Sequence, residues 1–292
     1  MARVTYVERA LTFECGGERL VGVLAEPVAH GDVGVVVVVG GPQYRVGSHR
    51  QFLLLGRRLA TEGIAVLRFD YRGMGDATGI IRSFDDVSPD IGAAFDAFQA
   101  ACPTVRRIVL WGLCDAASAA LIYYETTRDT RVAGVAILNP WVRSDATMAK
   151  VHLKHYYSRR VLERQFWHKL ARGGVSLAGA ARSLVGSIAA ASLRRRQRDG
   201  SIPAAFQDRM ARGLEAFHGP VLIVSSENDL TAKEFVEFAR SEPNWRLLLA
   251  RKNVDRQDVC DADHTFSTAR WRREVEDRTL AWIRRAILGR AQ

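Results

Sequence analysis

The sequence predicts an α/β protein: a mostly parallel, twisted sheet with helices on both faces and a helical insertion. Three observations support this fold class. Residues 33–39 are six valines and one glycine, and an apolar run without alternation is typical of a strand buried on both faces of a parallel sheet. Strand-like and helix-like segments alternate along most of the chain, as they do in doubly wound sheets. The alternation stops after Pro140 for about 80 residues and then resumes, which indicates an insertion.

Turn and cap signals set the order of the elements. Gly16-Gly17 separates two short apolar segments and predicts a hairpin. Ser48 precedes a helix with one apolar face, and Ser88-Pro89 is typical of an N-cap followed by proline in the first helical turn. The expected strands are 11–15, 20–26, 33–39, 64–69, 107–111, 132–138, 220–225 and 246–250. The expected helices are 48–60, 88–102, 115–125, 231–240 and 267–288.

The net charge of +10 belongs to the predicted insertion. Between Trp141 and Gly219 there are 15 Lys and Arg against 5 Asp and Glu, so the remainder of the chain is balanced. We therefore expect a core of residues 1–140 and 220–292 and a basic helical cap or lid of residues 141–219. Such a lid could hold a phosphate-bearing substrate or touch an anionic membrane surface, and its charges could equally form a solvated helical face. The sequence contains no recognisable nucleic-acid-binding module, so nucleic acid is not an expected partner.

The four cysteines, at positions 15, 102, 114 and 260, form no C-x-x-C pair, so neither a zinc site nor a disulfide framework is expected. The first ten residues carry three charges and no apolar h-region, and no charge-free apolar run reaches membrane-spanning length. We therefore expect a cytoplasmic protein. Nothing in the sequence requires a cofactor or a metal.

The strongest functional signal is residues 112–116, Gly-Leu-Cys-Asp-Ala, at a predicted strand–helix junction. This is the pattern of a nucleophile elbow, G-x-S-x-G, with cysteine in place of serine and alanine in place of the last glycine. The sharp turn needs small residues two positions on either side of the nucleophile, and Gly112 and Ala116 meet that need. The elbow also places Cys114 at a helix N-terminus, where the helix dipole favours a thiolate. Ser118, one turn further along, is the competing nucleophile, and its position indicates packing against the sheet.

A nucleophile of this kind needs a base, and the base needs an acid that orients it. Four of the seven histidines lie in the predicted insertion and two lie near the N-terminal turns, so His264, in the loop before the last helix, is the expected base. Asp229 follows the first strand after the insertion and is the expected acid. Glu227 is a close alternative, and Asp261 and Asp263 are weaker ones. The chain order of nucleophile, acid and base is that of the α/β-hydrolase fold.

Two backbone N–H groups are expected to form an oxyanion hole. One belongs to Asp115, which follows the nucleophile. The other belongs to the turn after the valine strand, where Pro42 has no N–H, so Gly41 is the first candidate and Gln43 the second. An Asp115 carboxylate pointing at the sulfur would oppose thiolate formation, and the sequence leaves its orientation open.

Three segments carry a resemblance to a known family. Residues 39–50 (VGGPQYRVGSHR), 68–76 (RFDYRGMGD) and 112–118 (GLCDAAS) are similar to those of the exosortase A system-associated hydrolase type 1 family, within the α/β-hydrolase superfamily. The resemblance implies an α/β-hydrolase fold and a bacterial cytoplasmic hydrolase encoded alongside exopolysaccharide and protein-sorting genes. The cysteine of the elbow also resembles that of dienelactone hydrolases, although this chain has a long basic insertion that those compact enzymes lack.

Together these residues predict a hydrolase that cleaves an ester or thioester of a small acyl substrate through an acyl-enzyme. In this interpretation Cys114 is the nucleophile, His264 the base and Asp229 the orienting acid, and the N–H groups of Gly41 and Asp115 bind the oxyanion. One alternative is an acyltransferase that passes the same acyl group to a sugar, lipid or amine. Another is a non-catalytic scaffold, which is disfavoured because all three triad positions hold usable side chains.

Overall fold

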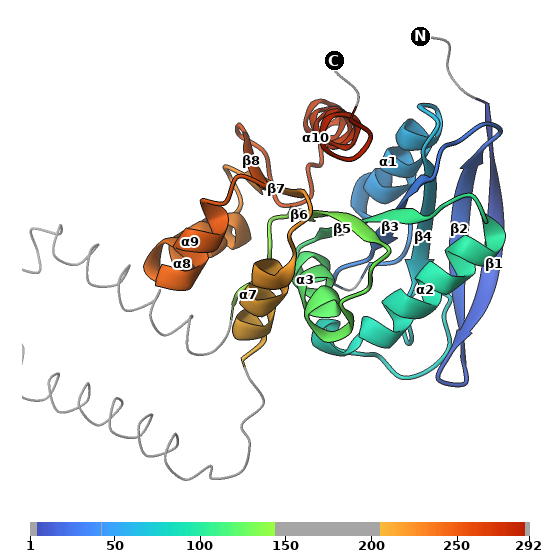
Figure 1. Cartoon of the computed structure of the whole chain (residues 1–292), viewed down its shortest axis with the longest axis horizontal. Coiled ribbons are helices and arrows are strands. Elements are labelled where there is room, and N and C mark those ends of the chain that lie inside the picture. The colour runs from blue at the N-terminus through green and yellow to red at the C-terminus, as the bar shows by residue number, and fades with distance from the viewer. Residues whose placement is uncertain (1–4, 42, 144–204, 290–292) are drawn as a thin grey trace, which may run out of the picture. The chain divides into compact units, whose positions relative to one another are not determined.

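The computed structural model describes residues 5–41, 43–143 and 205–289, and these residues include an eight-stranded sheet of order β1-β2-β4-β3-β5-β6-β7-β8 (Figure 1). The hairpin β1–β2 is antiparallel and β2 pairs antiparallel with β4, whereas every pair formed among β3 to β8 is parallel. This is the α/β-hydrolase fold, as the sequence predicts.

Most elements lie within a few residues of their predicted positions. The strands are β1 Tyr6–Cys15, β2 Glu18–Pro27, β3 Val33–Val38, β4 Ala65–Asp70, β5 Arg107–Leu113, β6 Val132–Leu138, β7 Val221–Ser226 and β8 Val254–Val259. The described helices are α1 Gln51–Ala60, α2 Ser88–Ala101, α3 Asp115–Thr127, α7 Phe206–Ala216, α8 Leu230–Ser241, α9 Pro243–Leu249 and α10 Ala269–Trp282. Short 3₁₀ turns form at Ser48–Arg50 and Phe84–Asp86, and a π-helical turn at Ile283–Ile287 continues α10.

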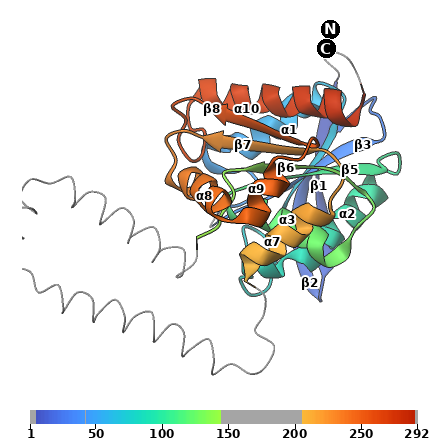
Figure 2. The same cartoon turned by 60° about the vertical axis from the view of Figure 1, so that its left-hand side comes forward.

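The sheet is covered on both faces. Helices α1 and α10 lie on one face, and α2 and α3 lie on the other (Figure 2). Every residue of the central strand β3 is buried, which confirms the interpretation of the valine run as a doubly covered strand. The parallel strands therefore bring their carboxyl ends, and the loops that follow them, to one edge of the sheet.

The predicted strand at 246–250 is wrong. Pro243 begins α9 instead, and Trp245 and Leu248, three residues apart, form its buried face. The last strand is β8, an edge strand whose four central residues are Asp, Arg, Gln and Asp. Charged residues commonly protect edge strands against pairing with other chains. Because they replace the apolar pattern of a strand here, the sequence does not predict β8.

Helix α7 belongs to the same compact unit as the sheet. That unit comprises Met1–Val142 and Phe206–Gln292, and Arg143–Ala205 form a second. A Cβ on Gly213 of α7 would overlap the carbonyl of Leu121 in α3, so the two helices pack backbone to backbone. Two of the basic residues counted in the insertion, Arg209 and Arg212, form ion pairs with Glu125 of α3. The core therefore includes residues 206–219 of the predicted insertion 141–219.

The remaining insertion prediction, over residues 144–204 and including the basic cluster at 194–198, lies outside the described residues. Among the helices that are described, none is long and apolar enough to cross a membrane.

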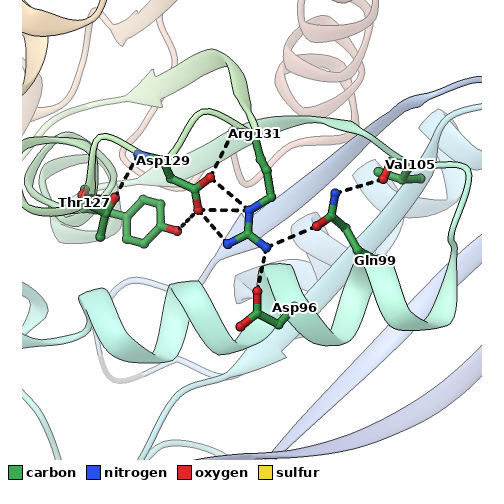
Figure 3. A network of polar contacts seen from close by, with 7 residues as sticks. Asp96, Gln99, Val105, Thr127, Asp129 and Arg131 are labelled. Carbon is green, nitrogen blue, oxygen red and sulfur yellow. Dashed lines mark hydrogen bonds and ion pairs between the residues drawn. The ribbon is translucent and has the colours of Figure 1, made fainter.

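A polar network joins helix α2 to the residues that precede β5 and β6 (Figure 3). Arg131, just before β6, forms ion pairs with Asp129 at 2.7 Å and with Asp96 of α2 at 2.6 Å. It also donates to Gln99, which in turn donates to the carbonyl of Val105. These contacts anchor the entry into two neighbouring strands, β5 and β6, whose other ends carry the candidate active site.

Candidate active site

The backbone at Cys114 has the geometry of a nucleophile elbow. Cys114 lies between β5 and α3 with φ 64° and ψ −126°, a positive φ that is uncommon for a residue other than glycine. Its N–H donates to the carbonyl of Leu138 at 2.9 Å, and its own carbonyl accepts from the N–H of Trp141 at 3.2 Å. A Cβ on Gly112 would meet the carbonyl oxygen of Ala116 at 2.5 Å, so this turn needs the small residue that the elbow pattern predicts. The thiol is partly exposed at the N-terminus of α3.

His264 and Asp229 form a hydrogen-bonded pair at the same edge of the sheet. The Nδ1 of His264 donates to Oδ2 of Asp229 at 2.8 Å. Asp229 is buried at the N-cap of α8, where its carboxylate also accepts from the N–H groups of Thr231 and Ala232 at 3.1 and 3.0 Å. The helix N-terminus thus fixes the carboxylate, and the carboxylate fixes the imidazole ring.

The hydrogen bonds of His264 favour its protonated imidazole. The hydrogen bond to Asp229, and next the hydrogen bond to Cys114, raise the pKa of His264 to about 10, although burial opposes the rise. Burial is the largest single influence and would raise the pKa of Asp229, but the hydrogen bond and charge of His264, together with the N–H groups of Ala232 and Thr231, outweigh it and lower that pKa. His264 therefore contacts both the Asp229 carboxylate and the Cys114 thiol.

The alternative residues left open by the sequence lie elsewhere. Glu227 is exposed and accepts from the N–H of Asp261 at 3.2 Å. The carboxylate of Asp263 accepts from N–H groups of its own turn. Ser118 is fully buried, and its hydroxyl donates to the carbonyl of Trp141 at 2.6 Å. The structure brings Cys114, His264 and Asp229 together, and it does not bring these other side chains into that group.

One of the two predicted oxyanion-hole donors, the N–H of Gly41, is hydrogen-bonded within the protein. The N–H of Gly41 donates to Oδ1 of Asp115 at 2.7 Å, so the Asp115 carboxylate points toward the turn after β3. Burial raises the pKa of Asp115, and the N–H groups of Gly41, Ala116 and Asp115 itself act in the opposite direction. The side chain of Gln43 accepts from the N–H of Ser48 at 2.9 Å and holds the same turn.

Sequence reasoning missed two buried polar residues that hold the His264 loop. Asn139 follows β6, and its amide donates to the carbonyl of His264 at 3.1 Å and to the hydroxyl of Ser226 at 2.9 Å. Ser226, the last residue of β7, donates in turn to the carbonyl of Asp263 at 2.9 Å. Their positions in the sequence could have indicated this role. Both are polar residues at the carboxyl ends of neighbouring parallel strands, where folds of this kind place their active sites.

An ion-pair network holds the turn that carries Gly41. The fully buried carboxylate of Asp70, at the end of β4, accepts from the backbone N–H of Arg45 at 2.7 Å and from that of Asp76 at 3.1 Å. The guanidinium of Arg45 forms ion pairs with both Asp70 and Asp76. These residues belong to two of the three segments that carry the family resemblance, and their contacts join the turn after β3 to the turn after β4.

One group among the described residues has side chains spaced to hold a metal: Glu26, His30 and Cys102, with ligand atoms within 4.8 Å of one another. It lies at the opposite edge of the sheet from Cys114. The Cys102 thiol donates to Glu26 at 3.2 Å, and Arg9 forms an ion pair with Glu26 at 3.0 Å. The carboxylate thus has partners within the protein.

Comparison with known proteins identifies the family. The family model described as Serine aminopeptidase, S33 matches residues 33–237, which is more than half of the chain. The chain belongs to this family of α/β hydrolases. The matched span includes the elbow and Asp229 and ends before His264. The S33 description names a serine enzyme, whereas the elbow of this chain holds Cys114.

Solved structures share the fold at low sequence identity. The Pyrococcus furiosus esterase Pf2001 superposes with a TM-score of 0.62 at 16% identity, over 97% of this chain and 94% of that chain. The α/β hydrolase GrgF from Penicillium sp. sh18 gives 0.63 at 16% identity, over 97% and 99% of the two chains. A serine hydrolase without a lid from Xanthomonas campestris gives 0.56 at 16% identity, over 95% and 94%. A comparison with curated proteins finds no match.

Proposed function

We propose that this α/β hydrolase is a cysteine enzyme that cleaves an ester or thioester through an acyl-enzyme on Cys114. The observation that carries the proposal is the position of His264, which is hydrogen-bonded to Asp229 on one side and to Cys114 on the other. The strained backbone of the elbow supports it, because backbone strain of this kind is concentrated at functional sites.

Acylation begins with transfer of the thiol proton of Cys114 to His264. The imidazole takes the thiol proton through its hydrogen bond to Cys114, and the sulfur attacks the substrate carbonyl carbon. A carbon–sulfur bond forms, and the carbonyl oxygen becomes an oxyanion that accepts from the N–H groups of Gly41 and Asp115. The oxyanion then collapses, the bond to the alcohol or thiol leaving group breaks, and His264 returns the proton to that group.

Deacylation uses the same residues in reverse roles. The neutral imidazole of His264 takes a proton from water as the water oxygen attacks the thioester carbonyl. The carbon–sulfur bond then breaks, the acid leaves, and the proton on His264 restores the starting pair with Cys114. Asp229 holds the ring through Nδ1 in both steps and stabilises its positive charge.

The biological setting follows from the resemblance of the three sequence segments. On that basis we place the hydrolase in exopolysaccharide- and exosortase-associated metabolism, with a small acyl compound as its substrate. The same acyl-enzyme could pass its acyl group to a sugar, lipid or amine, and the partition of product between acid and added acceptor separates this transfer from hydrolysis.

The direct test is to trap the acyl-enzyme. The purified chain is mixed with 4-nitrophenyl acetate, quenched in acid within a second, digested and analysed by peptide mass. We expect an acetyl group on the peptide that contains Cys114, and loss of both the adduct and the nitrophenol burst in Cys114→Ala. Cys260→Ser is the matched control, because Cys260 is an exposed thiol and its removal should leave burst and adduct unchanged.

Two results would contradict the proposal. One is full nitrophenol release by Cys114→Ala, and the other is acetylation of Ser118 in place of Cys114.

A further inference from the structure

The carboxylate of Asp115 lies where the two predicted oxyanion donors meet. Its Oδ1 accepts from the N–H of Gly41 at 2.7 Å. The N–H groups that lower the pKa of Asp115 also include its own and that of Ala116, at the first turn of α3. The carboxylate thus accepts from the turn after β3 and lies beside the N–H groups that follow the nucleophile. These two turns are the sources of oxyanion donors in this fold.

The path of the chain makes room for this contact. Gly40 is buried, and a Cβ on it would overlap both Oδ1 of Asp115 and the carbonyl of Leu113. The absence of a side chain at position 40 therefore lets the carboxylate reach the N–H of Gly41. The turn itself is held by the contacts of Arg45 with Asp70, so its N–H stays directed at Asp115.

A carboxylate oxygen resembles the group that an oxyanion hole is built to bind. It is a negatively charged oxygen that accepts strong hydrogen bonds from backbone N–H groups, as the oxyanion of a tetrahedral intermediate does. The N–H of Gly41 cannot donate fully to both. An oxyanion beside an ionised Asp115 would also meet like-charge repulsion.

We propose that the Asp115 carboxylate fills the oxyanion hole of the free enzyme and must leave it before the carbonyl oxygen of the substrate can bind. This inference rests on the proposed function and adds a residue that controls it. Asp115 is then a built-in competitor of the substrate carbonyl. Only the fraction of enzyme molecules with the carboxylate displaced can be acylated, so the observed acylation rate is the intrinsic rate multiplied by that fraction.

In the described part of the chain, the titratable groups that interact with Asp115 include His264 and Tyr71. His264 lowers the pKa of Asp115 through its charge, and Asp115 in turn raises the pKa of the buried Tyr71 hydroxyl, where burial is the larger cause. Displacement of the carboxylate therefore changes the field at the catalytic pair as well as freeing Gly41. An experiment must separate these two effects.

The test compares two reactions of Cys114. Acylation by 4-nitrophenyl acetate passes through a tetrahedral oxyanion, whereas alkylation by iodoacetamide is a direct displacement at carbon that forms none. Both rates are measured for the full chain and for Asp115→Ala, Asp115→Asn and the control Asp258→Ala, which removes an exposed carboxylate on β8. Thermal melting of each variant checks that it folds, and Asp115→Asn remains informative if Asp115→Ala does not fold.

We expect Asp115→Ala to raise kcat/KM for 4-nitrophenyl acetate by about 10-fold or more, because a single oxyanion-hole donor is typically worth about 10²–10³ in rate. Iodoacetamide alkylation should change by less than about threefold. Asp115→Asn keeps an acceptor at Gly41 but loses the charge, so its acylation rate should lie between those of the full chain and Asp115→Ala.

Other outcomes overturn the inference. Equal or slower acylation by a folded Asp115→Ala, with unchanged alkylation, would mean that Asp115 is an anchor of the oxyanion turn or an ordinary acid at a helix N-terminus. Parallel changes in acylation and alkylation would place its effect on the thiolate. If activity of the full chain did not depend on Cys114 at all, the proposed function would fail first, and Cys114→Ala in the same series detects that case.

Discussion

The candidate active site has two halves, the acid–base residues and the oxyanion-binding turn, and they differ in whether their reactive groups are already hydrogen-bonded within the protein. In the acid–base half, N–H groups of α8 donate to the Asp229 carboxylate, and this carboxylate accepts from Nδ1 of His264. The ring of His264 is also hydrogen-bonded to Cys114. In the oxyanion half, the N–H of Gly41 is bonded to the Asp115 carboxylate. In the proposed mechanism, the acid–base half is therefore ready for reaction, whereas the Asp115 carboxylate occupies the oxyanion half. Under the two proposals above, alkylation of Cys114 is expected to be fast and its attack on carbonyls slow.

The largest expected effect tests the acid–base half. His264→Ala should lower kcat/KM for 4-nitrophenyl acetate by about 10³-fold or more, because the base and the proton donor are lost together. His30→Ala, at the opposite edge of the sheet, is the control and should stay within about twofold of the full chain. A loss of less than tenfold in His264→Ala would separate this histidine from the chemistry.

The next effect decides between the two acids that the sequence leaves open. Asp229→Asn should reduce kcat/KM by about 10²–10⁴, because the amide can present its N–H to Nδ1 and favour the wrong tautomer. Glu227→Gln should change it by less than about twofold, because Glu227 is exposed and bonded to the N–H of Asp261. Steady-state kinetics on the two variants gives the answer, and a larger loss in Glu227→Gln would reverse the assignment.

A smaller effect concerns the support of the His264 loop. Asn139→Ala removes the hydrogen bonds of the Asn139 amide with the backbone N–H and the hydroxyl of Ser226 and with the carbonyl of His264. Leaving such buried groups without a partner typically lowers the unfolding free energy by about 1–3 kcal/mol. Urea denaturation measures the loss. We expect a drop in kcat/KM of about tenfold or less from the displaced loop, with the KM of the substrate nearly constant. An unchanged denaturation midpoint would show that these hydrogen bonds do not hold the loop.

The smallest effect is the pH dependence of the Cys114–His264 contact. The pKa of His264 is raised from 6.5 to about 10, so its contribution to stability is complete below pH 6.5 and is lost as the pH rises toward 10. Between pH 6.5 and 9.5 the unfolding free energy of the full chain should therefore fall more than that of His264→Gln. The difference should be on the order of 1 kcal/mol, because solvent reaches part of the ring. A constant difference would contradict the raised pKa.

Much of the fold can be predicted from the sequence because its signals are local. The valine run of β3, the Gly16-Gly17 hairpin and the small residues around Cys114 each reflect a constraint that acts within a few residues. The failures depend on contacts between distant segments. The polar edge strand β8 and the packing of α7 on α3 are decided by neighbours in space, and local patterns do not contain them.

The candidate active site shows the same difference between what local sequence signals predict and what only contacts between distant segments decide. Position along the fold predicts Cys114, His264 and Asp229 as a set, because the α/β-hydrolase chain order fixes which loops meet. The choice of Asp229 over Glu227 needs a distance, 2.8 Å to His264, that no sequence pattern encodes. The direction of the Asp115 carboxylate likewise depends on the missing side chain at Gly40, 75 positions earlier in the chain.

The most direct test of the central claim is the rate of iodoacetamide alkylation of Cys114 between pH 5 and 9, read by peptide mass. Exposed Cys260 serves as the reference thiol in the same sample, and His264→Ala is measured alongside. An activated Cys114–His264 pair predicts that Cys114 reacts faster than Cys260 below pH 7 and that this advantage disappears in His264→Ala. If Cys114 followed the pH profile of Cys260, or kept its advantage without His264, the account of this site as a cysteine–histidine hydrolase would be wrong.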